Sequence, residues 1–296
     1  MLVNIIPRRP YGNTEILVSS AGLGAAQIGN AGITEAEVNR LLNHAIDAGI
    51  TLLDTAPSYG LSERRIGQHL ARRRNDFVLS TKLGYGVDGT ADWTGQCITA
   101  GVEQALRIMQ TDRIDIAHLH SCSKATLERD DVIDALELAK RQGKVRAIAY
   151  SGDNEDLVYA IATGRFDGFM ASLNLCDQGL IKTALPRMGN KGFIAKRPAA
   201  NHPWRFDQLP VGEYCEEYWR RWQAMKIDHR DMPWGELALR FTLSIPRVCS
   251  AIVGTANRAH LLQNIQWAAK GPLDKRQVEE IQSRFQLHGD DWRGEV

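Results

Sequence analysis

Four polar side chains stand at, or just after, the ends of short apolar runs in the first half of the chain. Asp54 ends one run, and Tyr59 follows it in the next segment. Lys82 ends the next run along the chain, and His120 ends the run after that. In a barrel of parallel strands, the side chains at the carboxyl ends of the strands face the substrate. If these runs are neighbouring strands, a carboxylate, a phenol, an ammonium and an imidazole meet at one site.

These four groups suit the reduction of a carbonyl group. Hydride addition to C=O creates an alkoxide that must be protonated, and a tyrosine hydroxyl is a suitable acid, a role open to Tyr59. The pKa of a phenol, roughly 10, falls beside a lysine ammonium, which keeps its charge in a buried site when a carboxylate pairs with it. Lys82 and Asp54 fill those two roles. A neutral His120 imidazole would donate a hydrogen bond to the carbonyl oxygen and polarise it.

Each of these residues also has an ordinary structural explanation when taken alone. A single Asp, Tyr, Lys or His near a loop is more often a cap, a surface group or a satisfied core residue, and many buried Asp–Lys pairs are structural. The joint occurrence of four complementary groups at three successive run ends favours a catalytic site.

A metal site is a further hypothesis, because His118 and His120 share one face of their run. Zinc would need a third protein ligand, and Asp54 is already paired with Lys82. We therefore expect no metal and interpret His118 as a hydrogen-bonded barrel residue.

The elements that must position these residues alternate regularly. Eight short apolar runs are separated by segments of helical periodicity, which predicts an α/β fold of the (β/α)8 TIM barrel class. The runs are Ala21–Ile28, Ile50–Asp54, Phe77–Lys82, Ile114–His120, Val145–Ser151, Gly168–Asn174, Gly192–Arg197 and Ser250–Gly254.

The intervening segments carry helix signals. Thr34 and Glu37 predict a capping box before a helix whose apolar face runs from Val38 to Ile46. Similar periodicity recurs over residues 98–109 and 132–139, and Gly49 and Gly143 are predicted to end two of these helices.

Additional segments complete the expected barrel. The turn Tyr11–Thr14 followed by Glu15–Ser19 predicts a β-hairpin that plugs the N-terminal end of the barrel. Asn201–Arg230 is long, rich in Trp and without a strand signal, so we expect a loop over the active face. From the length of the chain we expect a single domain over residues 1–296, and we expect a C-terminal helix to complete the fold.

The composition of the chain limits the kinds of molecule that the protein is expected to bind. The 36 Lys and Arg against 35 Asp and Glu leave a net charge of +1, which offers no field to attract nucleic acid or an anionic membrane. The five widely spaced cysteines are typical of reduced thiols, and the chain has no apolar run of signal-peptide or membrane-spanning length. We expect a cytoplasmic protein acting on a small-molecule carbonyl substrate, and no protein partner can be named.

Three segments resemble those that carry the catalytic tetrad in the aldo-keto reductase family. They are Asp54–Gly60, Ser80–Gly84 and Asp115–His120, and the order and spacing match. Further matches extend the resemblance over nearly the whole chain, at Arg9–Gly12, Gly22–Gly24, Gly254–Thr255 and Gln263–Asn264. The resemblance implies reduction of aldehydes or ketones, reversible as an alcohol or sugar dehydrogenase. It also implies NADPH (NADP+) bound in an extended form without a Rossmann domain, with NADH as a second option.

The absence of a GxGxxG motif agrees with that way of binding the cofactor. Gly254 and Thr255 lead into a helix start, where backbone N–H groups and the helix dipole suit an anion. In the resemblance, Gln263 and Asn264 contact the adenine. The implied cofactor contacts are Gly24, Ala25, Asp54, Ser151, Arg197, Pro198, Gly254, Thr255, Arg258, His260, Gln263 and Asn264.

The chain departs from the family at the nicotinamide. Ser151 matches a serine that bonds the nicotinamide amide, but Gly152 and Met170 replace the usual asparagine and glutamine. Asp153, Asn154 and Asn174 are the available substitutes. Arg197 stands where relatives carry an aromatic or arginine side chain against the nicotinamide, and a guanidinium plane can stack there.

The 2′-phosphate is assigned to Thr255 and Arg258, with help from protonated His260. Side chains two residues apart on a helix point about 200° apart, so both reach one phosphate only if Arg258 lies in the loop before the helix. We expect that arrangement, and a modest preference for NADPH that strengthens at low pH.

Two other functions stay open. A Schiff-base aldolase could use Lys82, but it leaves Tyr59 and Gln263–Asn264 unexplained. A regulatory subunit that binds the cofactor and senses redox state with little turnover fits the departures at Gly152 and Met170.

Overall fold

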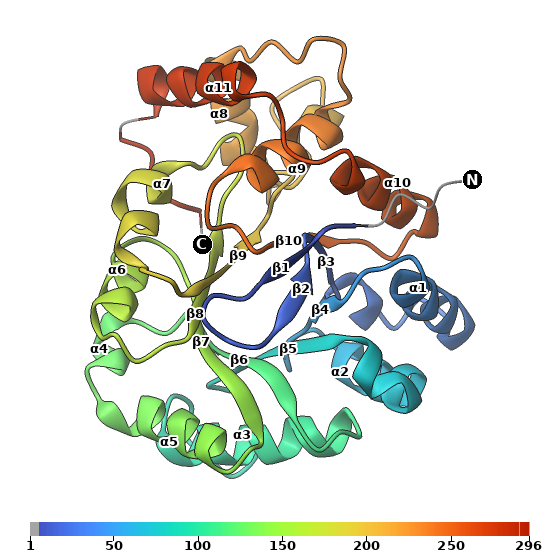
Figure 1. The fold of residues 1–296 in the computed structure, drawn as a ribbon, viewed down its shortest axis with the longest axis vertical. Helices are drawn as coiled ribbons and strands as arrows, with labels where there is room; N and C mark the ends of the chain where they lie inside the picture. The colour runs from blue at the N-terminus through green and yellow to red at the C-terminus, as the bar shows by residue number, and fades with distance from the viewer. Residues whose placement is uncertain (1–5, 290, 296) are drawn as a thin grey trace.

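Eight parallel strands close into one barrel, with helices outside it and a hairpin across one end (Figure 1). The computed structural model describes residues 6–289 and 291–295. The barrel strands, each paired with the next and the last with the first, are β3 (Ala21–Gly24), β4 (Leu52–Asp54), β5 (Val78–Leu83), β6 (Ile114–His120), β7 (Val145–Ser151), β8 (Gly168–Ser172), β9 (Gly192–Lys196) and β10 (Ser250–Gly254). The predicted (β/α)8 class is confirmed.

The strand ends refine the prediction. The predicted bounds of β6, β7 and β10 are confirmed to the residue, whereas the run Ala21–Ile28 is wrong in its length. That strand ends at Gly24 because the chain turns into the 3₁₀ helix η1 (Gln27–Gly29). β9 ends one residue before Arg197, whose φ of 55° lies in the left-handed region and breaks the strand.

Helices cross over between successive strands. They are α1 (Glu35–Asp47), α2 (Ser62–Leu70) with η2 (Ala71–Asp76), α3 (Gly95–Ile108), α4 (Lys124–Leu127), α5 (Asp130–Arg141), α6 (Asn154–Ala162), α7 (Gly179–Thr183) with η3 (Leu185–Arg187), η4 (Pro203–Arg205), α8 (Glu216–Met225) and α9 (Trp234–Ser244). After β10 follow α10 (Arg258–Ala269) and the C-terminal helix α11 (Lys275–His288).

The predicted capping box is present at the start of α1. Thr34 Oγ1 accepts from the Glu37 N–H, and the Glu37 carboxylate accepts from the Thr34 N–H at 3.0 Å. Gly49 and Gly143 follow the ends of α1 and α5 with φ of 95° and 75°, a conformation that favours glycine.

The hairpin closes the end of the barrel at which the strands begin. β1 (Arg8–Pro10) pairs antiparallel with β2 (Leu17–Ser19), as predicted. Tyr11, next to β1, is fully buried among the first residues of the strands. A Cβ at Gly168 or Gly192 would lie within 2.1 or 2.4 Å of the Tyr11 side chain, so the plug fits only because β8 and β9 begin with glycine.

The expected loop over 201–230 is wrong in part, since it contains α8 and η4. Tyr218, Arg221 and Met225 are buried at helical spacing, and Glu216 and Glu217 favour the helix start. In the sequence, the many tryptophans of this segment make the amphipathic pattern of α8 hard to recognise.

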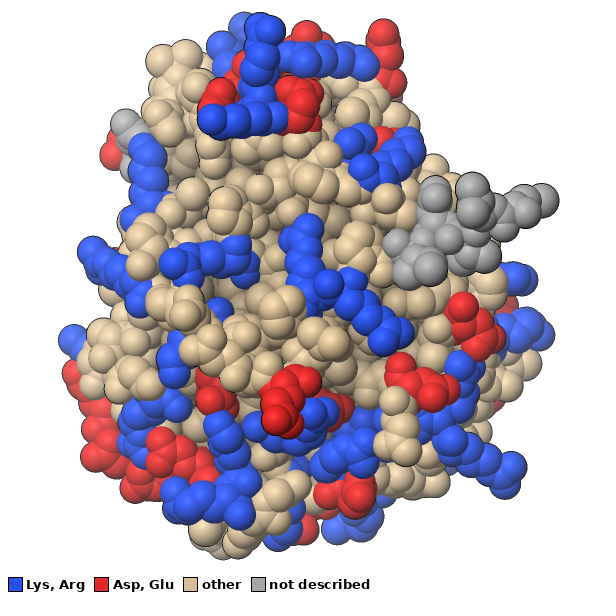
Figure 2. All heavy atoms as spheres, in the orientation of Figure 1, with Lys and Arg blue, Asp and Glu red and all other residues tan. Residues whose placement is uncertain are grey.

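The surface and the cysteines follow the composition. Basic and acidic side chains lie close together over the lower part of the face in Figure 2, in keeping with the net charge of +1. All five cysteines are free and buried. None of the helices in the described part of the chain is long and apolar enough to cross a membrane.

Candidate active site

The predicted catalytic residues meet at the carboxyl ends of β4, β5 and β6. Lys82 Nζ lies 2.6 Å from Asp54 Oδ2 and 2.8 Å from the Thr55 carbonyl oxygen. It also lies 4.8 Å from the centre of the Tyr59 ring, and the Tyr59 and His120 rings stand nearly perpendicular with centres 6.3 Å apart. All four residues line one cavity of about 660 Å³.

The Asp54–Lys82 pair is fully buried. Asp54 is 1 % exposed and Lys82 is 2 % exposed, and Asp54 Oδ1 accepts a second hydrogen bond from Ser80 Oγ at 2.8 Å. Burial by itself lowers the pKa of Lys82, but the Asp54 carboxylate and the neighbouring Tyr59 outweigh it, so the pKa of Lys82 lies above its ordinary value. Lys82 therefore holds a positive charge beside the Tyr59 ring.

The loop that carries Tyr59 is seated against η1. The Tyr59 N–H donates to the Ala56 carbonyl at 3.0 Å, and the Leu61 N–H donates to the Gly29 carbonyl at 3.1 Å. A Cβ at Gly29 would lie 1.7 Å from the Tyr59 carbonyl oxygen, so this close approach requires glycine at position 29.

His120 is held neutral, and it has a partner that the sequence analysis missed. Burial, followed by the positive charges of Lys82 and Lys196, lowers the pKa of His120 to about 3. The Tyr85 hydroxyl is hydrogen-bonded to His120 Nδ1, and the two rings stack with centres 5.4 Å apart. Tyr85 directly follows Gly84 in the segment that carries Lys82, and an aromatic residue just beyond a polar strand end was the available signal.

His118 lies inside the barrel wall, fully buried, with Nε2 3.1 Å from Ser80 Oγ. Ser80 also bonds Asp54, so His118 supports the site from behind. Burial lowers the pKa of His118 well below its ordinary value. Within residues 6–289 and 291–295, no three His, Cys, Asp or Glu side chains gather as a metal site would require.

The predicted cofactor contacts divide into two groups. Those that line the tetrad cavity are Gly24, Asp54, Ser151, Arg197, Pro198 and Gly254. Those that do not line it are Ala25, Thr255, Arg258, His260, Gln263 and Asn264. Ala25 is buried behind the wall and its N–H donates to the Asp54 carbonyl at 2.8 Å, while Ala26 and Gln27 line the cavity instead.

The departure at Gly152 has a steric cause. A Cβ at this position would lie 2.4 Å from the Tyr150 hydroxyl oxygen. The Tyr150 ring is fully buried, and its hydroxyl donates to the Cys122 carbonyl at 2.8 Å. Tyr150 therefore occupies the space that an asparagine side chain at position 152 would need.

The neighbouring side chains of Lys196 and Arg197 have different partners. Lys196 ends β9, lines the cavity and has its Nζ 2.7 Å from Asp153 Oδ2. The Arg197 guanidinium stacks over the Tyr214 ring at 4.7 Å and donates to the Glu295 carbonyl at 2.7 Å. Lys196 is thus a second ammonium near the tetrad, which the sequence analysis did not identify.

The other two residues considered as substitutes for the missing amides have partners elsewhere. Asn154 Nδ2 donates to the Gly294 carbonyl at 2.9 Å, and Asn174 Oδ1 accepts from the Cys176 N–H at 2.8 Å. Neither Asn154 nor Asn174 lines the tetrad cavity.

The expected position of Arg258 before the helix is wrong. Arg258 is the first residue of α10, and Asn257 is the N-cap, whose side chain accepts from the Ala259 and His260 N–H groups at 2.7 and 3.4 Å. The Arg258 guanidinium leans toward α1, 3.4 Å from His44 Nδ1. Because the helix already begins at Arg258, its side chain and that of His260 diverge.

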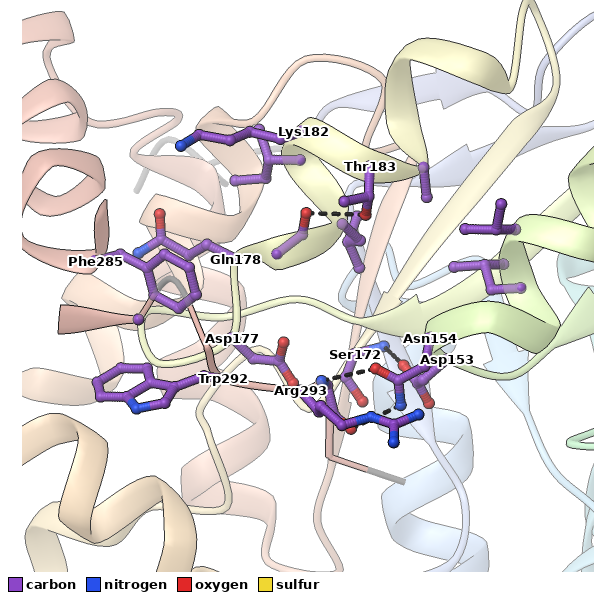
Figure 3. A pocket seen from close by; sticks show the side chains of 18 of the residues that line it. Asp153, Asn154, Ser172, Asp177, Gln178, Lys182, Thr183, Phe285, Trp292 and Arg293 are labelled. Atoms are coloured by element: carbon purple, nitrogen blue, oxygen red, sulfur yellow. Dashed lines mark hydrogen bonds between the residues drawn. The ribbon is translucent and has the colours of Figure 1, made fainter. Parts of the chain in front are cut away.

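A second cavity of about 530 Å³ adjoins the ends of β7 and β8. Figure 3 shows Phe285 and Trp292 on one side of it and Asp153 and Asn154 on the other. The segment 291–295 lines this second cavity through Trp292, Arg293 and Gly294. The Glu295 carbonyl accepts from Ser172 Oγ at 3.0 Å and also from Arg197, which lines the tetrad cavity.

Comparison with known proteins agrees with the geometry. Residues 21–284 match the model of the Aldo/keto reductase family. The chain is 29 % identical to the D-threo-aldose 1-dehydrogenase of a Pseudomonas species, with 86 % of this chain and 90 % of the relative covered. It is 26 % identical to the L-galactose dehydrogenase of Arabidopsis thaliana, over 88 % of this chain and 87 % of the relative.

A solved structure has the same architecture. The holo form of an aldo-keto reductase from Bacillus halodurans superposes with a TM-score of 0.82 at 25 % identity, over 94 % of this chain and 96 % of that one. The chain therefore belongs to the aldo/keto reductase family of NAD(P)H-dependent oxidoreductases.

Proposed function

We propose that the protein reduces aldehydes or ketones to alcohols with NADPH and that Tyr59 is the general acid. The observation that carries this proposal is the meeting of Tyr59, the buried Lys82–Asp54 pair and a neutral His120 at one cavity. An aldolase would need a lysine free to attack a carbonyl, whereas the Lys82 ammonium is bound to Asp54 and Thr55.

The residues that line the cavity suit a nicotinamide dinucleotide. Gly24 and Gly254, which lie side by side at the ends of β3 and β10, offer backbone without side chains for close approach. Lys196, Arg197 and Arg205 line the same cavity, and their positive charges suit a diphosphate. These residues, with Ser151, would hold the cofactor.

Each residue of the tetrad then has a defined part in the reaction. A nicotinamide cofactor, when bound, would supply the hydride for this reduction. Tyr59 gives its hydroxyl proton to the carbonyl oxygen, and the Lys82 ammonium stabilises the phenolate that remains. Asp54 keeps that ammonium charged, and the neutral His120 donates a hydrogen bond that polarises the carbonyl.

The same residues serve the reverse reaction. In that direction the Tyr59 phenolate removes the proton of an alcohol, which would make the protein a sugar or alcohol dehydrogenase. The two relatives named as aldose and galactose dehydrogenases favour small sugars as substrates for this direction. The five buried free cysteines fit a reducing compartment such as the cytoplasm.

Turnover assays test the proposal directly. Purified protein is mixed with NADPH and nitrobenzaldehyde, methylglyoxal or diones, or with NADP+ and aldoses, and the nicotinamide absorbance is followed. We expect many turnovers per active site. Cofactor binding without turnover on any of these compounds would instead support the redox-sensing regulatory function.

The preference for NADPH is the finer part of the proposal. Since Arg258 and His260 diverge, one positive charge rather than two reaches the 2′-phosphate, so we expect NADPH to bind less than about 10-fold more tightly than NADH, on the order of one charge-assisted hydrogen bond. A relative from Escherichia coli, 25 % identical, is named as an NADH-specific methylglyoxal reductase, so NADH stays an alternative. Dissociation constants for both cofactors at pH 6 and pH 8, in the wild type and in Arg258→Ala, measure the preference for NADPH over NADH.

A further inference from the structure

Tyr85 is wedged between the proposed catalytic histidine and the loop that carries Tyr59. Its hydroxyl is hydrogen-bonded to His120 Nδ1 and lies 2.8 Å from Ser58 Oγ. Its ring stacks on the His120 imidazole at an interplanar angle of 28° and meets the Trp93 ring with centres 5.8 Å apart. The Tyr85 side chain is therefore held by contacts to three other side chains.

The packing of Trp93 near Tyr85 depends on Gly84. This glycine has a φ of 133°, and a Cβ there would lie 2.1 Å from the Trp93 ring. The Trp93 N–H also donates to the Gly84 carbonyl at 2.6 Å. The segment that follows β5 is thus folded so that Trp93 supports Tyr85, and Tyr85 supports His120.

A neutral imidazole has one N–H donor and one bare nitrogen acceptor, and only one of its two tautomers can donate to a substrate through Nε2. His120 is neutral because burial and the charges of Lys82 and Lys196 lower its pKa to about 3. Lys82 Nζ is bonded to Asp54 and Thr55, and Lys196 is paired with Asp153, so neither lysine selects the tautomer by a bond of its own.

The Tyr85–His120 bond makes that selection. A phenol is a stronger acid than a serine hydroxyl, and an imidazole nitrogen is a better acceptor than a serine oxygen. The favoured chain therefore runs from the Ser58 hydroxyl to the Tyr85 oxygen, and from the Tyr85 hydroxyl to His120 Nδ1. With Nδ1 as the acceptor, the single ring proton of His120 lies on Nε2.

We propose that Tyr85 is a positioning residue that holds His120 in the Nε2–H tautomer, so that the imidazole donates to the carbonyl oxygen beside Tyr59. The kinetic consequence rests on the proposed reductase function. The tautomer itself does not, because it is a property of the free protein and can be measured without substrate.

The test is ¹⁵N NMR of histidine-labelled protein, in which a protonated and a bare ring nitrogen have distinct chemical shifts. His120→Gln identifies the signals of His120. We expect the wild type to show Nε2 protonated and Nδ1 bare, and Tyr85→Phe to show a substantial Nδ1–H population. Ser58→Ala is the matched control, since it removes a bond to Tyr85 but keeps the bond from Tyr85 to His120, and we expect the Nε2–H tautomer to persist.

Kinetics give the second readout. Tyr85→Phe should lower kcat by roughly 3- to 10-fold, as for the loss of one hydrogen bond, while the dissociation constant of NADPH changes little. In a His120→Gln background the same substitution should have no further effect, because Tyr85 acts through His120. A wild-type His120 protonated on Nδ1, or an unchanged tautomer in Tyr85→Phe, would overturn the proposal. If no carbonyl compound is turned over, the NMR result still decides the role of Tyr85 while the proposed function fails.

Discussion

Two aspartate–lysine pairs contribute their lysines to the same cavity, and the pKa values of the two lysines shift in opposite directions. Asp54 and Lys82 join the neighbouring strands β4 and β5 at 2.6 Å, whereas Asp153 and Lys196 span the ends of β7 and β9 at 2.7 Å. The Lys82 side chain is 3 % exposed and that of Lys196 is 17 % exposed. Yet the pKa of Lys82 is raised, and that of Lys196 is lowered.

The surroundings explain the difference. Burial is the largest influence on both lysines and lowers the pKa of each. Around Lys82, Asp54 and Tyr59 more than offset it, and the Thr55 carbonyl accepts a further hydrogen bond. Around Lys196, the attraction of Asp153 is opposed by the positive charges of Arg197 and Lys82. A buried Asp–Lys pair therefore does not by itself identify a catalytic lysine, because the neighbouring charges decide how firmly the proton is held.

The largest effect is expected at the first pair. Lys82→Met leaves the Asp54 carboxylate buried and unpaired, which should lower the free energy of unfolding by about 3–5 kcal/mol and abolish most activity. Chemical denaturation monitored by circular dichroism measures the stability. An unchanged midpoint would mean that Asp54 and Lys82 do not form a pair in solution.

Tyr59→Phe tests the catalytic role of the site while leaving the Asp54–Lys82 pair in place. It removes the proposed proton donor but leaves Asp54 and Lys82 bonded, so carbonyl reduction should fall by roughly 100- to 10,000-fold with little change in NADPH affinity or stability. Steady-state kinetics and fluorescence titration with NADPH are the measurements. Turnover at the wild-type rate would show that another group supplies the proton.

Lys196→Met tests the second pair and should do less harm. The Lys196 side chain is more exposed than that of Lys82, so water can partly take its place beside Asp153. We therefore expect a loss of about 1–3 kcal/mol in the free energy of unfolding, the cost of one unsatisfied buried group. NADPH should bind more weakly, because a positive charge leaves the cavity. A loss as large as that in Lys82→Met would contradict the contrast between the two pairs.

The stability of the protein at low pH tests how the positive charge of Lys196 affects the pKa of His120. The folded-state pKa of His120, about 3, lies below its ordinary value of 6.5, so the unfolded chain binds more protons between these values. The contribution of His120 to stability is therefore intact above pH 6.5 and is lost progressively as the pH falls toward 3. In Lys196→Met the pKa of His120 should rise, and the part of the acid destabilisation due to His120 should shrink. His120→Gln is the control, since it should show the least loss. Equal acid sensitivity in all three proteins would disprove the linkage.

The amino-acid sequence was sufficient for the barrel and for the tetrad. The approximate position of a residue near a strand end is a local property, because the alternation of apolar runs and helical segments indicates where each strand stops. The ends at Asp54 and His120 are as predicted, and β5 continues one residue beyond Lys82. Parallel strands then bring their carboxyl ends to one face whatever the loops do. Asp54, Lys82 and His120 could be placed together on this basis, and so could Tyr59, which follows Asp54 after a short turn.

Contacts between side chains from distant segments were decided only by the tertiary structure. The Asp153–Lys196 pair skips a strand, and the Tyr85–His120 bond depends on how the segment after β5 packs under Trp93. Likewise, Gly152 looks in the sequence like a missing amide, and its cause is the Tyr150 ring folded back over it. Such contacts depend on rotamers and loop paths, which are set by the close packing of many residues at once and leave no periodic signal in the sequence.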